Sequence, residues 1–218
     1  AYRSDISKHS SKTESIRIGQ VLDSLPSQLV KENKKFIYGV IKEGARAKEF
    51  EVAIQWLMDA GIIHKVSRVK EIQMPVKFYE SLSAFKLFLL DCGLFACMVD
   101  APAKQMLVGD NIFKEYKGTF TEQFVLQQLV ALGKTPYYWS NETTPAEIDF
   151  VVQDSDRVIP IEVKAEENVR SRSLSTYISA NAERGLKGLR ISMKGYIDQG
   201  WMENIPLYAI SRYFSDNR

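Results

Sequence analysis

Two neighbouring segments decide the fold of the second half of this chain: AEIDFVV at residues 146–152 and IPIEVK at residues 159–164. Both are short, apolar and rich in β-branched residues, which is typical of buried strands. The polar residues 154–157 between them have turn chemistry, so we expect a β-hairpin with a four-residue loop. That loop places Asp149 directly opposite Glu162.

The predicted hairpin gathers charged side chains on one face. Opposed Cβ atoms of antiparallel strands lie about 4.5–5.5 Å apart, so the carboxylates of Asp149 and Glu162 are expected to be close. Side chains alternate along a strand, which places Lys164 on the face of Glu162 and sends Ile161 and Val163 into a core. Two facing anions repel each other unless a cation lies between them. A divalent metal and a nearby ammonium both meet this need, so the pattern indicates a metal-dependent phosphodiesterase site.

The same charged residues have a plainer interpretation. Lys164 then pairs with Asp149 and Glu162 on a half-exposed sheet face, as charged strand residues often do, and no chemistry follows. The spacing of the residues alone leaves both interpretations open.

Composition excludes several classes of protein. The chain has 218 residues, of which 45% are hydrophobic and 26% charged, as in ordinary globular proteins. The net charge of +2 does not by itself indicate a polyanionic partner. No stretch approaches the roughly 18–20 apolar residues of a membrane span, and no signal peptide is visible. Cys92 and Cys97 are expected to be buried free thiols. We therefore expect a cytoplasmic protein without a membrane partner.

The N-terminal sequence also suggests that the chain belongs to a longer polypeptide. It begins with Ala1 in a polar stretch that looks like the middle of a protein, so we expect an excised piece of a longer polypeptide. Composition changes around residues 100–102. We place the domain boundary there, which gives a first domain at residues 1–100 and a second at residues 101–218.

The first domain is predicted to contain helices followed by a two-stranded hairpin. Helical spacing covers residues 16–25 and 46–60, and strand patterns cover residues 62–69 and 85–90. This is the outline of a winged helix-turn-helix.

The candidate recognition helix of that module has mixed charge. Arg46 and Lys48 suit phosphates, but Glu49, Glu51 and Asp59 would repel a DNA groove. Neither half of the chain has the strong basic bias of a dedicated DNA binder. We favour a packing or interdomain element over a sequence reader.

The second domain is predicted to be an α/β layer. Besides the hairpin, its expected elements are a short helix plus connection at 101–117, helices at 119–132 and 172–184, and strands at 137–139, 188–193 and 206–210. The aromatic strand Tyr137-Tyr138-Trp139 offers rings for base stacking, but packing in the core is the favoured interpretation.

These motifs resemble those of the PD-(D/E)xK nuclease superfamily. More specifically, the chain is similar to the C-terminal part of a large family of bacterial and archaeal AAA-type ATPases. The carrying segments are residues 85–94, 118–125 and 137–139, together with the two site strands. The resemblance covers nearly the whole chain. It implies a PD-(D/E)xK restriction-endonuclease-like α/β (α+β) domain of unknown function, preceded by a winged-helix-like helical domain.

The resemblance also implies roles for four residues. Glu122 takes the helix carboxylate position, Asp149 and Glu162 take metal-ligand positions, and Lys164 takes the position of the catalytic lysine. The implied cofactor is Mg²⁺ or Mn²⁺, with Glu122 part of the metal site. One departure is visible, since the Pro-Asp of the superfamily is Ile148-Asp149 here.

The same resemblance implies which partners the chain binds. No Gly-x-x-x-x-Gly-Lys-Ser/Thr motif occurs in the chain, so ATP belongs only to the missing upstream half and no ATPase activity is expected here. That upstream ATPase domain is one expected partner, and nucleic acid, most simply DNA, is the other. The alternative is a catalytically inactive nuclease-fold module for nucleic-acid or protein interaction.

Overall fold

The computed structural model describes residues 10–31, 34–101, 114–165 and 171–215. Within them it has seven α-helices and an eight-stranded mixed sheet, which confirms an α/β protein at that level. Two compact units divide the chain, namely residues 1–65 with 85–110, and residues 66–84 with 111–218. Residues 66–84, which the sequence assigned to the first domain, therefore lie with the second unit. The predicted domain boundary after residue 100 stays a prediction.

The first unit is built around helix α2 (Lys12–Leu29), together with α3 (Tyr38–Ile41), α4 (Ala47–Asp59) and α5 (Cys92–Met98). A capping box starts α2, because the Ser11 hydroxyl accepts from the Glu14 N–H while the Glu14 carboxylate accepts from the Ser11 N–H. This cap extends the helix beyond the predicted start at residue 16. Pro26 lies inside α2 and does not end it.

The two longest helices of this unit supply its core. On α2 the buried stripe includes Ile18, Val21 and Leu25, and α4 packs against it through Phe50 and Leu57. Both stripes follow the helical spacing read from the sequence.

The cysteines differ from expectation. Both thiols are free, as predicted, but Cys92 is only half-buried and Cys97 is exposed. The physical reason is that α5 is a short surface helix. Asp91 caps it, and the side chain that it buries is Phe95 and not a cysteine. The prediction of buried thiols is therefore wrong.

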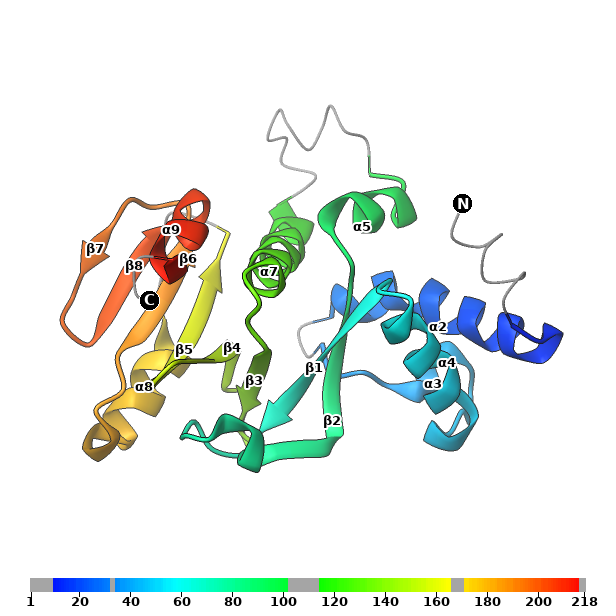
Figure 1. Cartoon of the computed structure of the whole chain (residues 1–218), viewed down its shortest axis with the longest axis horizontal. Coiled ribbons are helices and arrows are strands. Elements are labelled where there is room, and N and C mark those ends of the chain that lie inside the picture. The colour runs from blue at the N-terminus through cyan, green and yellow to red at the C-terminus, as the bar shows by residue number, and fades with distance from the viewer. Residues whose placement is uncertain (1–9, 32–33, 102–113, 166–170, 216–218) are drawn as a thin grey trace. The chain divides into compact units, whose positions relative to one another are not determined.

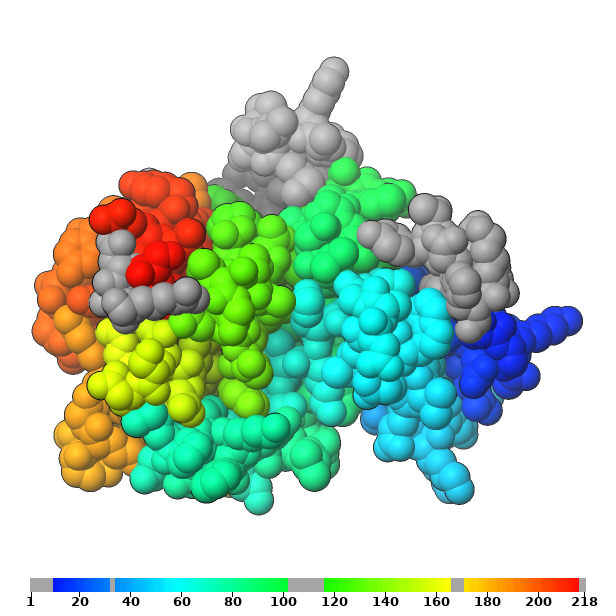
Figure 2. Space-filling model, in the orientation of Figure 1, coloured from blue at the N-terminus to red at the C-terminus, as the bar shows by residue number. Residues whose placement is uncertain are grey.

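The second unit contains most of the sheet, in the order β2-β1-β3-β4-β5-β6-β8-β7 (Figure 1). The strands are β1 (Ile63–Val69), β2 (Glu80–Leu89), β3 (Pro136–Ser140), β4 (Glu147–Asp154), β5 (Arg157–Lys164), β6 (Gly188–Ser192), β7 (Ile197–Asp198) and β8 (Met202–Pro206), and only residues 66–69 of β1 and 80–84 of β2 belong to this unit. The central strands β3, β4 and β5 are antiparallel, whereas β1–β3, β5–β6 and β6–β8 are parallel. The sheet ends in the short hairpin of β7 and β8, which lies at the surface (orange in Figure 2).

The decisive hairpin has the predicted register but a tighter turn. Val151 lies opposite Pro160, as expected. The pairing continues to Asp154 opposite Arg157, and Ser155 takes a left-handed φ of 55° in the two-residue turn that remains. The four-residue loop is therefore wrong. Two-residue turns of this kind match the right-handed twist of the flanking strands, so the ladder closes further.

Three helices accompany the sheet in this unit: α7 (Lys114–Ala131), α8 (Arg172–Ala180) and α9 (Ile210–Ser215). Both α7 and α8 pack on β5. Residues 158–163 of β5 are buried without a break, so both faces of this strand are covered. Glu162 is buried in this way, whereas Asp149 and Lys164 are partly exposed, so the plainer interpretation of the charged residues stays open.

Two sequence predictions near the C-terminus fail. The strand expected at residues 206–210 lies earlier, since β8 ends at Pro206 and a 3-10 turn leads directly into α9. The strand was missed because it contains the polar residue Asn204. Asn204 is nevertheless fully buried, and hydrogen bonds from its amide to two backbone carbonyls compensate for the burial. The helix expected at 172–184 ends at Ala180 and is followed by a separate 3-10 turn. The short helix expected within residues 101–117 falls mostly outside the described residues.

None of the helices in the described part of the chain is both long enough and apolar enough to span a membrane.

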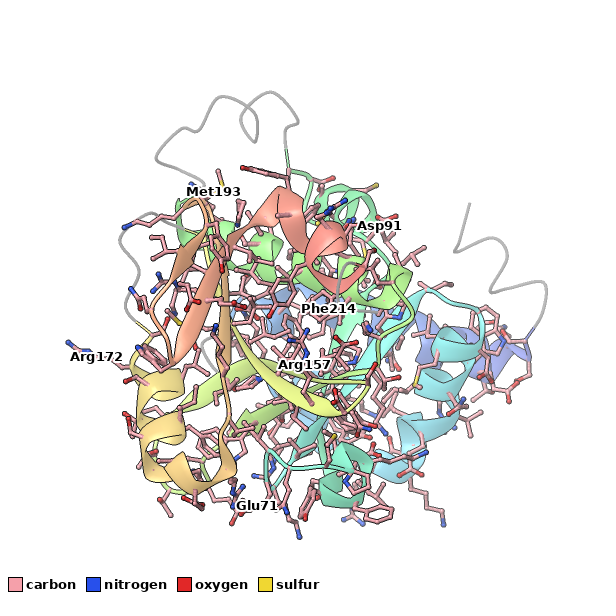
Figure 3. The ribbon with its side chains drawn as sticks, turned by 60° about the vertical axis from the view of Figure 1, so that its left-hand side comes forward. Glu71, Asp91, Arg157, Arg172, Met193 and Phe214 are labelled. Atoms are coloured by element: carbon pink, nitrogen blue, oxygen red, sulfur yellow. The ribbon has the colours of Figure 1, made fainter. Side chains whose placement is uncertain are left out.

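A buried ion pair is expected to stabilise the turn end of the hairpin. Asp154 is 3% exposed and pairs with Lys134 and, more weakly, with Arg157, the residue labelled in Figure 3. Burial alone would raise the pKa of Asp154, but Lys134 and then Arg157 outweigh it and hold the pKa below its ordinary value. Lys134→Met should therefore cost on the order of 2 kcal/mol of unfolding free energy at pH 7, measured by urea denaturation.

The stability that this ion pair contributes should depend on pH. A carboxyl with a depressed folded pKa contributes stability above its unfolded pKa and loses it as pH falls through the folded value. The gap between wild type and Lys134→Met should narrow under acid conditions. A gap that is independent of pH would contradict the charged pair. Arg157→Gln, which removes the more exposed partner, serves as the milder control.

Glycine is needed where α8 meets β6. A Cβ added at Gly188 would lie 2.9 Å from Leu174 Cδ2 and 3.0 Å from Ile178 Cδ1. Both side chains are buried in the core cluster, so Gly188→Ala should destabilise the fold by about 1–3 kcal/mol. Gly118→Ala in α7 is the matched control, because an added Cβ would meet no described atom within 4 Å and alanine is the better helix former. Equal thermal midpoints for the two variants would refute the close contact.

Candidate functional site

An irregularity in the sheet lies at the expected site. Between the ladder pairs Tyr137 with Val151 and Trp139 with Ile148, β3 advances by two residues while β4 advances by three. The extra residue of β4 therefore falls in the interval that contains Asp149. Such bulges re-aim side chains and are common beside active sites.

Asp149 uses this freedom to reach the neighbouring strand. The regular β4–β5 pairing is described up to Phe150 opposite Ile161, one step short of the expected pair. In its place, Asp149 Oδ2 accepts a hydrogen bond of 2.7 Å from the backbone N–H of Val163. The carboxylate is thereby anchored to the residue between Glu162 and Lys164.

Glu162 is a buried carboxylate with one oxygen in an ion pair. The residue is 6% exposed, and its Oε1 lies 2.5 Å from Lys164 Nζ. Its Oε2 is also buried and has no hydrogen-bond partner among the described residues. Burial raises the pKa of Glu162; Lys164 opposes this effect, while Glu122 and Glu147 add to it.

Lys164 interacts electrostatically with the three carboxylates of the candidate site. Burial alone would lower the pKa of Lys164, but Glu162 and then Asp149 and Glu122 outweigh it, so the pKa is raised. The ammonium therefore stays protonated at neutral pH.

The four charged residues predicted from the sequence thus act on one another across three elements. Asp149 lies on β4, Glu162 and Lys164 on β5, and Glu122 on α7, which packs against β5. Their proposed roles as ligands or catalysts stay predictions.

The structure adds two residues that sequence reasoning did not assign to the site. Glu147 contributes to the raised pKa of Glu162. Its position on the same strand as Asp149 was a usable signal. Arg190 lies beside Glu162 in the parallel pairing of β5 with β6, and its burial lowers its pKa while Glu162 opposes that shift. No sequence pattern reveals this neighbour, because the pairing joins distant segments.

Arg190 is held by a buried polar network. Its Nε donates to Asn204 Oδ1 at 2.8 Å, and the Ser192 hydroxyl donates to the same oxygen at 2.7 Å. The Asn204 amide donates in turn to the carbonyls of Lys194 and Gly195. A satisfied network of this kind fixes the guanidinium rigidly behind the site.

The donor set suits a divalent cation only in part. In the ranges that the structure describes, no group of three or more His, Cys, Asp or Glu side chains is arranged to hold a metal ion. Asp149 and Glu162 nevertheless supply carboxylate oxygens, the ligands that Mg²⁺ and Mn²⁺ prefer, and Glu162 Oε2 is a buried acceptor with an unmet need. Since Mg²⁺ keeps several waters and often uses one or two protein carboxylates, these residues fit such an ion.

Two family models match separate parts of the chain. Residues 117–212 match a family model described as a domain of unknown function (DUF4143), which is associated with the C-termini of AAA ATPases. Residues 1–105 match a second model, also described as a domain of unknown function (DUF8612). No curated protein and no solved structure matches the chain. The match at residues 117–212 is thus to a domain associated with AAA-ATPase C-termini, as the resemblance implied, whereas the winged helix and the nuclease fold stay predictions.

Proposed function

We propose that the second unit is a divalent-metal-dependent phosphodiesterase with a PD-(D/E)xK nuclease fold, acting on DNA. One arrangement carries the proposal: Asp149 on β4 accepts a hydrogen bond from the Val163 N–H on β5, between Glu162 and Lys164, and Lys164 pairs with Glu162 at 2.5 Å. A surface ion pair needs one partner, whereas a phosphoryl-transfer site needs a cation among several anions that share a metal.

In this proposal the acidic residues bind the metal ion. Asp149, Glu162 and the backbone carbonyl of Val163 hold Mg²⁺ or Mn²⁺, and Glu122 joins the site directly or through a water. When bound, the cation polarises the phosphodiester and makes water a better nucleophile.

Lys164 acts as a cation in this proposal. Its Nζ lies 2.5 Å from Glu162 Oε1, so it enters the site as an ammonium that donates hydrogen bonds. It positions the attacking water and stabilises the negative charge that develops as water adds to phosphorus and the bond to the leaving oxygen breaks.

The rest of the chain supplies context. We propose that it is the C-terminal part of an AAA-type ATPase, whose upstream half binds ATP and regulates cleavage. The first unit, winged-helix-like in this proposal, serves as a packing element, since α4 carries Glu49, Glu51 and Asp59 alongside its few basic residues.

A second candidate function is a catalytically inactive module that binds nucleic acid or a protein partner. Two observations favour it. Lys164 already pairs directly with Glu162 at 2.5 Å, and the described residues contain no three-ligand metal cluster. In that case the charged residues contribute only to stability.

Calorimetric titration with Mn²⁺ separates the two functions. The wild-type chain should bind Mn²⁺, and Asp149→Asn should weaken binding by at least about tenfold, because a neutral amide is a poorer ligand than a carboxylate. Asp156→Asn is the matched control, since it removes an exposed carboxylate from the turn at the other end of the same hairpin. Equal affinity for all three proteins, or no binding by any of them, would favour the inactive module.

Plasmid nicking tests the role of Lys164. With Mn²⁺ or Mg²⁺, Lys164→Ala should cut supercoiled DNA on the order of 10²–10³-fold more slowly than wild type, because it lacks the cation that stabilises the transition state. Its Mn²⁺ affinity should be retained, since the amine is not a ligand. A variant as fast as wild type would exclude this role. Plasmid left intact by wild type, even with the ATPase half present, would count against the enzyme.

A further inference from the structure

A groove of about 780 Å³ lies in the second unit between α8, the end of β1 and the end of β3. This volume is within the ~300–1,000 Å³ typical of ligand sites. We call it the α8 groove. The residues that matter for its chemistry are Arg68, Lys70, Trp139, Glu142, Tyr177 and Arg184.

Two aromatic rings line the groove in a fixed arrangement. The rings of Trp139 and Tyr177 meet edge to face, with centroids 4.6 Å apart and planes at 64°. Trp139 donates its indole N–H to the carbonyl of Lys70 at 3.3 Å, and the Tyr177 hydroxyl accepts from the N–H of Ile72 at 3.0 Å and from Arg184 at 3.2 Å. Trp139 remains partly exposed, so it presents a preorganised apolar surface to the groove.

Arg68 is a partly buried cation whose main partner is an exposed carboxylate. Its side chain is 16% exposed, and Nη2 lies 2.9 Å from Glu142 Oε1, a side chain that is 72% exposed. Arg68 Nε is buried and has no hydrogen-bond partner among the described residues. The guanidinium therefore has a donor that Glu142 does not satisfy, and a bidentate anion would use it better.

The loop that carries Glu142 is held in place beside the cation. Asn141 Oδ1 accepts from the backbone N–H groups of Thr143 and Thr144, which closes a tight turn. Lys70 lies exposed at the rim, and Arg184 pairs with Glu71 at 2.7 Å (Figure 3). Cations thus outnumber carboxylates in the groove, three to two.

The groove is linked to the candidate site through strands β3 and β4. Ser140, which lines the groove, is paired along the ladder with Glu147. The charge of Glu147 acts in turn on Glu162. Ala146 lines the groove on the strand approach to Asp149.

We propose that the α8 groove binds a single-stranded segment of nucleic acid next to the cleavage site, and this inference rests on the proposed function. A phosphate displaces Glu142 from Arg68 and takes both the Nη2 and Nε donors, while the adjoining base packs on Trp139. Glu142 acts as a placeholder that keeps Arg68 oriented until the strand arrives. Single strands suit this combination, because only unpaired bases expose a face for stacking beside a cationic track.

Fluorescence anisotropy of a labelled oligothymidylate, measured in EDTA, tests the groove independently of the metal site. Arg68→Gln should weaken binding by about tenfold, whereas Glu142→Gln should tighten it, because the competing carboxylate is removed. Lys187→Gln is the matched control, since it removes the same charge from an ion pair outside the groove. Arg68→Lys should recover only part of the affinity, because an ammonium lacks the planar fork.

Stacking of a base on Trp139 can be measured separately, by tryptophan fluorescence. The chain has three tryptophans, so Trp56→Phe with Trp201→Phe leaves Trp139 as the only indole. The oligonucleotide should quench its fluorescence, and Arg68→Gln should weaken that quenching in parallel with anisotropy.

Four results would contradict binding of a single strand in the α8 groove. Two concern the variants: an equal loss of oligonucleotide affinity in Arg68→Gln and Lys187→Gln, or no gain of affinity in Glu142→Gln. The other two are Trp139 fluorescence that the oligonucleotide does not quench, and tighter binding of a duplex than of a single strand. Failure of the wild-type chain to bind Mn²⁺, with groove binding intact, would refute only the proposed cleavage. If Arg68→Gln fails to fold, Glu142→Gln and the quenching measurement still decide.

Discussion

Burial of Glu162 is the constraint on which the candidate site depends. A carboxylate that is 6% exposed is costly unless a cation compensates it. Lys164 provides that charge from the same strand, and Arg190 provides a second from the next strand. The covering of β5 on both faces is therefore compatible with a charged cluster only because these cations are present.

The surroundings of the cluster make its geometry specific. The bulge in β4 frees Asp149 from the regular ladder, and its hydrogen bond to Val163 fixes it against β5. Behind the cluster, Arg190 is immobilised through Asn204 and Ser192. Such preorganisation serves a reaction in which negative charge develops, because the dipoles need not reorganise. It serves equally to hold a rigid binding surface, which is why the inactive module remains the rival function.

Much of the site was predictable because its signals are local. Alternation along residues 146–153 and 158–164 gave the hairpin and its register, and the helical pattern from residue 119 gave the element that carries Glu122. The turn was expected to be too long, because polar residues do not show how far a ladder closes. The tether from Asp149 to Val163 depends on a bulge, and bulges leave no mark in a periodic pattern.

The features that sequence reasoning missed depend on distant segments. Arg190 reaches Glu162 only through the parallel pairing of β5 with β6, and β8 was misplaced because Asn204 is a buried polar residue in a strand. Arg68 and Trp139 come together because β1 pairs with β3. Cys97 was expected in the core because its neighbours are apolar, yet α5 buries Phe95.

The proposed metal site can be tested by locating Mn²⁺ in crystals of the chain from the anomalous scattering of the metal. A metal-dependent site should give one strong peak within ligand distance of the carboxylates of Asp149 and Glu162, with Lys164 turned away from Glu162. Crystals that show no peak there in saturating Mn²⁺, with the Lys164–Glu162 ion pair intact, would contradict it.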